Sequence, residues 1–106
     1  AKTFDKCACL GPCLYVPPEP LSLDTTISIL IHREEKEVFS GKTTLSEMKR
    51  TPNELIGFLF RETSFPQGVF LMTGTGIVPS NNFTLQSGDV VSISIDLIGT
   101  LVNSVE

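Results

Sequence analysis

Two runs in which apolar and polar side chains alternate constrain the fold of this chain more than any other feature. Between Asp24 and His32, isoleucine occupies every second position from residue 27 to residue 31. Between Val91 and Leu97, an apolar residue alternates with serine or aspartate. Successive side chains of a β-strand point to opposite faces of its sheet, so each run predicts a strand with one apolar face. An apolar face has to be covered, and the fold is therefore expected to be built around a sheet.

A further strand is predicted directly after the first one. Residues 33–36 are charged and read as a turn, Glu37–Ser40 can continue as a strand, and Gly41 ends it. Two short strands joined by a tight polar turn are typical of a β-hairpin. Later in the chain, the apolar segment Val69–Thr73 predicts one more short strand.

The clearest helix start lies at Thr51. Threonine can cap free backbone N–H groups, Pro52 suits the first helical position, and Glu54 can complete a capping box. Apolar residues at positions 55, 56, 59 and 60 then share one side at helical spacing. The segment Ser64–Gly68 is expected to end this helix.

The C-terminal third is expected to hold a loop and one long extended region. Residues 79–89 predict a loop that ends in the turn pair Gly88-Asp89. Gly99 interrupts the last alternating strand, and residues 101–105 are expected to continue it as an extended piece. The predicted fold is thus a single β-rich α+β unit, a curled mixed sheet with one short helix.

Composition excludes two classes of function. The formal net charge is -4 with no run of basic residues, which argues against nucleic-acid binding. No stretch of about 18 apolar residues predicts a membrane span. The first residues do not resemble a signal peptide and lack an initiator methionine, so the chain is expected to begin within a longer protein of the cytoplasm.

Few residues suggest chemistry by themselves. Cys7, Cys9 and Cys13 read as reduced thiols, because the only histidine, His32, is too far along the chain to complete an obvious metal site. The turn Thr73–Gly76 is the best local candidate, since two glycines let the backbone approach a ligand and the Thr75 hydroxyl can donate and accept hydrogen bonds. A plain tight turn would explain the same residues. Lys2, taken alone, reads as a solvated charge.

Five short motifs in order nevertheless resemble the C-terminal part of the fumarylacetoacetate hydrolase family. They are Ala1–Asp5, Leu10–Pro12, Met72–Thr75, Leu85 with Gly88-Asp89, and Ile98–Leu101 with Asn103 and Val105. The variants Cys9–Pro12 and Thr73–Pro79, the latter followed by Phe83–Leu85, are similar to the branch of 2-keto-3-deoxy sugar-acid dehydratases. The resemblance implies the curled sheet, or β-roll, of that family's C-terminal domain. It makes residues 1–106 the C-terminal portion of a catalytic domain.

The resemblance also implies a site. Lys2 matches the family lysine and is the expected catalytic residue, while Lys2, Gly74 and Thr75 are the expected substrate-binding residues. The implied cofactor is Mg²⁺, held by carboxylates of an upstream segment, so no metal ligand is expected in residues 1–106. The metal would stabilise the enolate that forms when a C3 proton leaves a bound 2-keto acid. The expected partners are this substrate, the remainder of the same protein and further copies of it.

The leading hypothesis is a lyase that dehydrates a 2-keto-3-deoxy pentonate to 2-oxoglutarate semialdehyde in pentose oxidation. Two alternatives stay open. One is an acylpyruvate hydrolase or oxaloacetate decarboxylase of the same family, and the other is a non-catalytic domain that has kept the fold.

Overall fold

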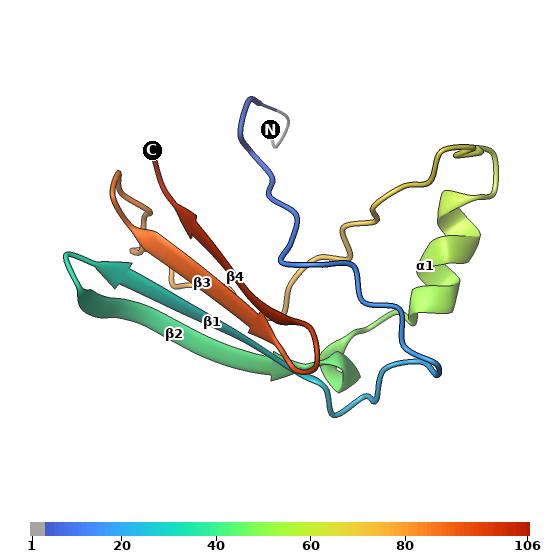
Figure 1. The fold of residues 1–106 in the computed structure, drawn as a ribbon, viewed down its shortest axis with the longest axis horizontal. Coiled ribbons are helices and arrows are strands. Elements are labelled where there is room, and N and C mark those ends of the chain that lie inside the picture. Colours follow the sequence, from blue (N-terminus) through green and yellow to red (C-terminus); the bar gives the residue numbers. More distant parts are fainter. Residues whose placement is uncertain (1–3) are drawn as a thin grey trace.

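A four-stranded sheet forms the main body of the molecule in a computed structural model that describes residues 4–106 (Figure 1). Its strands are β1 (Thr26–Arg33), β2 (Lys36–Thr44), β3 (Val90–Ile95) and β4 (Gly99–Ser104). The order across the sheet is β2-β1-β3-β4, and all three pairings are antiparallel. One turn of 3-10 helix, η1 (Leu45–Glu47), and one short helix, α1 (Pro52–Leu59), complete the regular structure described. The prediction of a β-rich fold with one short helix is confirmed.

The strand register places the alternating isoleucines on one face of the sheet. Ile29 of β1 pairs with Gly41 of β2 and Ile93 of β3, and Ile93 pairs in turn with Leu101 of β4. The opposite face carries the serines, and on it Ser94 and Thr100 share a hydrogen bond of 2.7 Å between their hydroxyl oxygens. The apolar face is only partly covered by the described residues, because Ile31 alone among its isoleucines is buried.

The second strand is longer than predicted. β2 does not end at Gly41 but continues through it to Thr44, and Thr44 pairs with Thr26. A glycine weakens a strand because it has no side chain to pack. Here the residues on both sides of Gly41 pair with β1, and this pairing keeps Gly41 in the strand. A shift in register between Ile31 and His32 adds a β-bulge near the hairpin turn.

The predicted strand Val69–Thr73 is wrong. In the part of the chain that the structure describes, this segment joins no ladder, and its side chains from Val69 to Met72 are all exposed. An apolar run becomes a strand only where another strand can satisfy its backbone N–H and C=O groups. Within residues 4–106 no strand edge is paired with it.

Gly99 also acts differently from the prediction. The chain reverses at residues 96–98, so that β4 returns antiparallel to β3 instead of extending it. Leu97 has a φ of 68° and Gly99 a φ of 122°, the positive values that such a tight reversal needs. Leu97, at the tip of this reversal, is 76% exposed.

The helix start follows the predicted chemistry. The Thr51 hydroxyl accepts a hydrogen bond of 3.2 Å from the Glu54 backbone N–H, and the Glu54 carboxylate accepts one of 2.7 Å from the Thr51 N–H. The capping box is therefore complete. The helix ends at Leu59, earlier than the predicted Ser64–Gly68, and it stands away from the sheet (Figure 1).

The segment before β1 is a loop, as predicted, and its first part runs beside β4 (Figure 1). The Cys13 thiol donates to the Ile98 carbonyl at 3.5 Å, and an ion pair joins Lys6 to Glu106. In the part of the chain that the structure describes, no helix is both long and apolar enough to cross a membrane.

Candidate functional site

The predicted turn Thr73–Gly76 has irregular backbone with a bend at Gly76, and it lies on the long segment that returns from α1 to β3 (Figure 1). Gly74 has a φ of 84°, a value that a side chain would disfavour, and both Gly74 and Thr75 are exposed. Among residues 4–106, no hydrogen bond occupies the backbone N–H of either residue. Two consecutive backbone donors that no group within residues 4–106 occupies can serve an anionic oxygen.

The Thr75 hydroxyl is held by its own turn. It accepts a hydrogen bond of 3.0 Å from the Ile77 backbone N–H and lies 3.3 Å from the Ile77 carbonyl oxygen, to which it can donate. A hydroxyl has one hydrogen to donate, so a ligand oxygen and the Ile77 carbonyl compete for it. The hydrogen bond from the Ile77 N–H uses a lone pair of the Thr75 oxygen. The Thr75 hydroxyl hydrogen can therefore still turn toward a ligand.

An apolar hollow lies nearby on the sheet but does not include this turn. It has a volume of about 520 Å³ and is lined by side chains of β1 and β3 together with the loop before β3, namely Ile29, Ile31, Val91, Val78, Pro79, Ser80, Asn81, Phe83 and Leu85. No charged side chain lines it, so the hollow suits an apolar group rather than a carboxylate. Within residues 4–106, Gly74 and Thr75 are not among the residues that line this hollow.

The predicted catalytic residue, Lys2, lies outside the described residues. The next lysine along the chain, Lys6, is paired with Glu106, and both side chains are about three-quarters exposed (74% and 76%). Of the predicted site residues, the described chain thus contains Gly74 and Thr75, which are neighbours on one segment.

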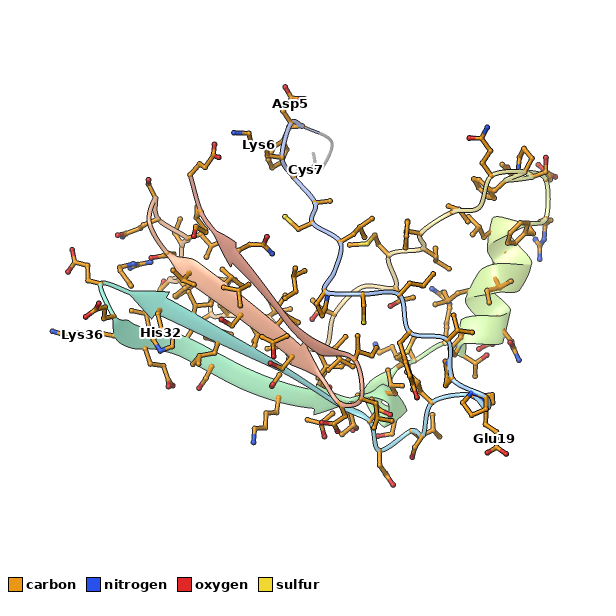
Figure 2. The ribbon with its side chains drawn as sticks, in the orientation of Figure 1. Asp5, Lys6, Cys7, Glu19, His32 and Lys36 are labelled. Atoms are coloured by element: carbon orange, nitrogen blue, oxygen red, sulfur yellow. The ribbon has the colours of Figure 1, made fainter. Side chains whose placement is uncertain are left out.

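The remaining polar groups singled out in the sequence are spread over the molecule. Figure 2 shows Lys6 and Cys7 near the N-terminal end of the described chain, and His32 beside the β1–β2 hairpin turn. Cys7, Cys9 and Cys13 are free and exposed. Across residues 4–106, no three His, Cys, Asp or Glu side chains come together in a group that could hold a metal ion.

One buried ionic contact was missed by sequence reasoning. Asp89, predicted only as a turn residue, is fully buried (0% exposed), and both its oxygens accept hydrogen bonds from Arg33. These bonds from Arg33, together with one from the Gln86 backbone N–H, lower the pKa of Asp89 to about 2. Arg33 also donates to the Thr84 carbonyl, so the pair fixes the loop before β3 onto β1. No local pattern in the sequence signals a pair between residues so far apart.

A family model for the fumarylacetoacetate hydrolase C-terminal domain matches residues 1–106, the whole of the chain. This chain belongs to the fumarylacetoacetate hydrolase family. The fold described above is thus that of a C-terminal domain of that family.

Two relatives in the family are similar over almost the entire chain. The chain is 39% identical over 108 residues to a "Probable 2-keto-3-deoxyxylonate dehydratase" of Haloferax volcanii, covering 99% of this chain and 37% of that protein. It is 37% identical over 109 residues to a 2-dehydro-3-deoxy-D-arabinonate dehydratase of Saccharolobus solfataricus, covering 100% of this chain and 36% of that protein. The chain therefore spans about a third of the length of these relatives.

Solved structures of this family agree with the fold. The structure of a 2-keto-3-deoxy-D-arabinonate dehydratase complexed with magnesium and 2,5-dioxopentanoate is similar, with a TM-score of 0.78 and 36% identity. The match covers 85% of this chain and 31% of that one. The apo form of the same dehydratase gives the same TM-score and identity.

Proposed function

We propose that the protein containing this chain is a hydro-lyase that converts a 2-keto-3-deoxy pentonate to 2,5-dioxopentanoate, which is 2-oxoglutarate semialdehyde, in pentose oxidation. The observation that carries the proposal is the likeness, at a TM-score of 0.78, to a dehydratase complexed with magnesium and 2,5-dioxopentanoate. Both similar relatives are also described as dehydratases of 2-keto-3-deoxy sugar acids.

The role proposed for the Gly74-Thr75 turn is to bind the substrate carboxylate. The two free N–H groups would donate to its oxygens, and the Thr75 hydroxyl would give up its contact with the Ile77 carbonyl and donate as well. Hydrogen bonds to a charged group contribute more than those to a neutral one. Fixing the carboxylate would also fix the C3 and C4 atoms, at which the reaction takes place.

The reaction itself removes one molecule of water. A base takes a C3 proton and the C4 hydroxyl leaves with a proton, which gives a 2-keto acid with a C3–C4 double bond and a C5 hydroxyl. Loss of a C5 proton and reprotonation at C3 then give a C4–C5 enol, which tautomerises to the product aldehyde. The role proposed for Lys2 is to stabilise the negative charge that develops on the substrate or to relay one of these protons.

We place the ligands of Mg²⁺ in the remainder of the protein. Residues 4–106 offer no group of three acidic, histidine or cysteine side chains for it, and Mg²⁺ prefers carboxylate and water oxygens. On the same proposal, residues 1–106 are the C-terminal portion of the catalytic domain, and the upstream remainder completes the active site.

We further propose a cytoplasmic homo-oligomer. Three exposed free thiols suit a reducing compartment. Exposed apolar side chains on β4 and α1, among them Val102 and Phe58, offer surface for a partner copy. Sedimentation of the full-length protein as a monomer at micromolar concentration would contradict the oligomer.

The deciding experiment is an assay of the full-length protein with Mg²⁺ on 2-keto-3-deoxyarabinonate and 2-keto-3-deoxyxylonate, with the product identified by NMR. Acylpyruvates and oxaloacetate are assayed alongside. The proposal expects 2,5-dioxopentanoate from at least one sugar acid, with much slower turnover of the other compounds. Turnover of acylpyruvate or oxaloacetate alone would favour the second enzyme activity, and no turnover at all would favour a non-catalytic domain.

A further inference from the structure

The glycine of strand β2 faces the loop that carries Thr75. A Cβ atom added to Gly41 would lie 2.6 Å from the Cγ2 methyl of Ile77, closer than real side chains approach one another. The backbone φ of Gly41 is not in the left-handed region, so its conformation does not call for glycine. Glycine is needed here because the γ-methyl of Ile77 occupies the volume that the Cβ of any other residue would fill.

A second contact joins the same loop to the same strand. A Cβ atom on Gly76 would lie 3.1 Å from the Thr43 hydroxyl oxygen. Gly41 and Thr43 are two residues apart on β2 and so lie on one face of the sheet, the face that also carries Ile29. Two successive loop residues are thus seated on one face of β2, and we call Gly41, Thr43, Gly76 and Ile77 the loop seat.

Ile77 links the loop seat to the Thr75 hydroxyl. Its backbone N–H donates to Thr75 Oγ1 at 3.0 Å, and its carbonyl oxygen lies 3.3 Å from the same atom. The residue whose side chain rests against Gly41 is therefore also the residue whose backbone orients the Thr75 hydroxyl.

We infer that Gly41 is a positioning residue for the Gly74-Thr75 turn, acting through the seated side chain of Ile77. The inference rests on the proposed function, in which this turn binds the substrate carboxylate. Isoleucine is branched at Cβ and stiff at χ1, so its γ-methyl cannot swing away from a new side chain without cost. A side chain at residue 41 would instead displace the loop, and a displacement of about 1 Å in a group that positions substrate can lower the rate about 100-fold.

The test uses size-matched variants of the full-length enzyme. Gly41→Ala should raise KM for the 2-keto-3-deoxy acid and lower kcat/KM by about 10- to 100-fold. Adding Ile77→Ala, which removes the γ-methyl, should recover most of that loss. Adding Ile77→Val instead, which keeps both γ-carbons, should recover little. Gly57→Ala is the matched control, because a Cβ at Gly57 in α1 would meet nothing within 4 Å.

Hydrogen exchange separates this inference from the proposed function. In Gly41→Ala the amide of Ile77 should exchange faster than in the wild type, because its bond to Thr75 loosens, and Ile77→Ala should reverse the change. A wild-type enzyme without activity on any 2-keto-3-deoxy acid would overturn the proposed function, while the exchange measurement would still report on the loop seat.

Two results would overturn the inference itself. One is wild-type kcat/KM in Gly41→Ala, whether or not Ile77 exchanges faster, and the other is failure of Ile77→Ala to recover activity in a folded double variant. If Gly41→Ala does not fold, Gly76→Ala provides the test. Its new Cβ would press on Thr43 less closely than a Cβ at Gly41 presses on Ile77, and KM should rise severalfold. Unchanged KM in that variant would equally overturn the inference.

Discussion

The guanidinium of Arg33 meets the carboxylate of Asp89 through two hydrogen bonds, each of 2.8 Å, and joins β1 to the residue just before β3. Asp89 is fully buried, whereas the Arg33 side chain is 29% exposed. A bidentate pair of this kind is geometrically specific as well as strong. It accounts for the fixed path of the loop that precedes β3.

Acid should weaken the folded state through Asp89. Its pKa in the folded protein is about 2, below the value of about 4 expected in an unfolded chain. A carboxylate whose pKa is lowered by folding stabilises the folded state at pH values above its unfolded-state pKa. That stabilisation is lost as the pH falls from about 4 through about 2. Urea unfolding of wild type and Asp89→Asn at several pH values checks this prediction. The two free energies of unfolding should differ most above pH 4 and converge near pH 2, and a constant difference would contradict it.

The capping box predicts a smaller, local effect. Thr51→Ala should lower the free energy of unfolding by about 1 kcal/mol, because it leaves the Glu54 backbone N–H without its partner. Thr63→Ala serves as the control, since Thr63 is exposed and lies beyond the end of the helix. Chemical denaturation measures the free energy of unfolding of both variants. An equal decrease in the two would show that loss of the capping hydrogen bond does not cause it.

Removal of the Thr75 hydroxyl should weaken substrate binding. We expect Thr75→Val to lower kcat/KM of the full-length enzyme by roughly 10- to 150-fold, the equivalent of about 1.5–3 kcal/mol for a hydrogen bond to a charged group. Thr75→Ser keeps the hydroxyl and should retain most activity, and Thr63→Ala should match the wild type. Steady-state kinetics with the sugar acid measures all three, and full activity in Thr75→Val would remove Thr75 from the site.

Loss of the lysine at residue 2 should affect the chemical step. Lys2→Ala is expected to lower kcat by about 10²- to 10⁴-fold with a smaller change in KM, as removal of an acid–base group does. Lys6→Ala is the matched control, because Lys6 is an exposed lysine paired with Glu106. Wild-type kcat in Lys2→Ala on every 2-keto-3-deoxy acid tried would make Lys2 an ordinary solvated lysine.

Magnesium should bind the full-length protein but not residues 1–106 alone. The described residues supply no cluster of acidic ligands, and Mg²⁺ usually needs at least one or two carboxylates. Isothermal titration of both proteins with MgCl₂ tests the difference, and circular dichroism shows whether the short chain is folded. Micromolar affinity in the folded short chain would place ligands within it.

The features that sequence predicted correctly depend on neighbours along the chain. Alternation with a period of two residues located β1 and β3, and the order of Thr51, Pro52 and Glu54 located the start of α1. Glycine spacing and a hydroxyl are also local signals, and they marked Thr73–Gly76 as a candidate turn, where the structure has irregular backbone with a bend at Gly76. The assignment of this segment to a site needed the resemblance to a family, since the same residues would also make an ordinary turn.

Tertiary structure decided what each segment pairs with. Val69–Met72 has the composition of a strand but joins no ladder within residues 4–106, while β2 runs through Gly41 because the ladder to β1 supports it. The loop seat of Gly41 and Ile77 and the pair of Arg33 and Asp89, 56 residues apart, arise only when the sheet brings distant segments together. Such contacts leave no local pattern, because each depends on the shape and charge of a partner whose place is set by the packing of the whole sheet.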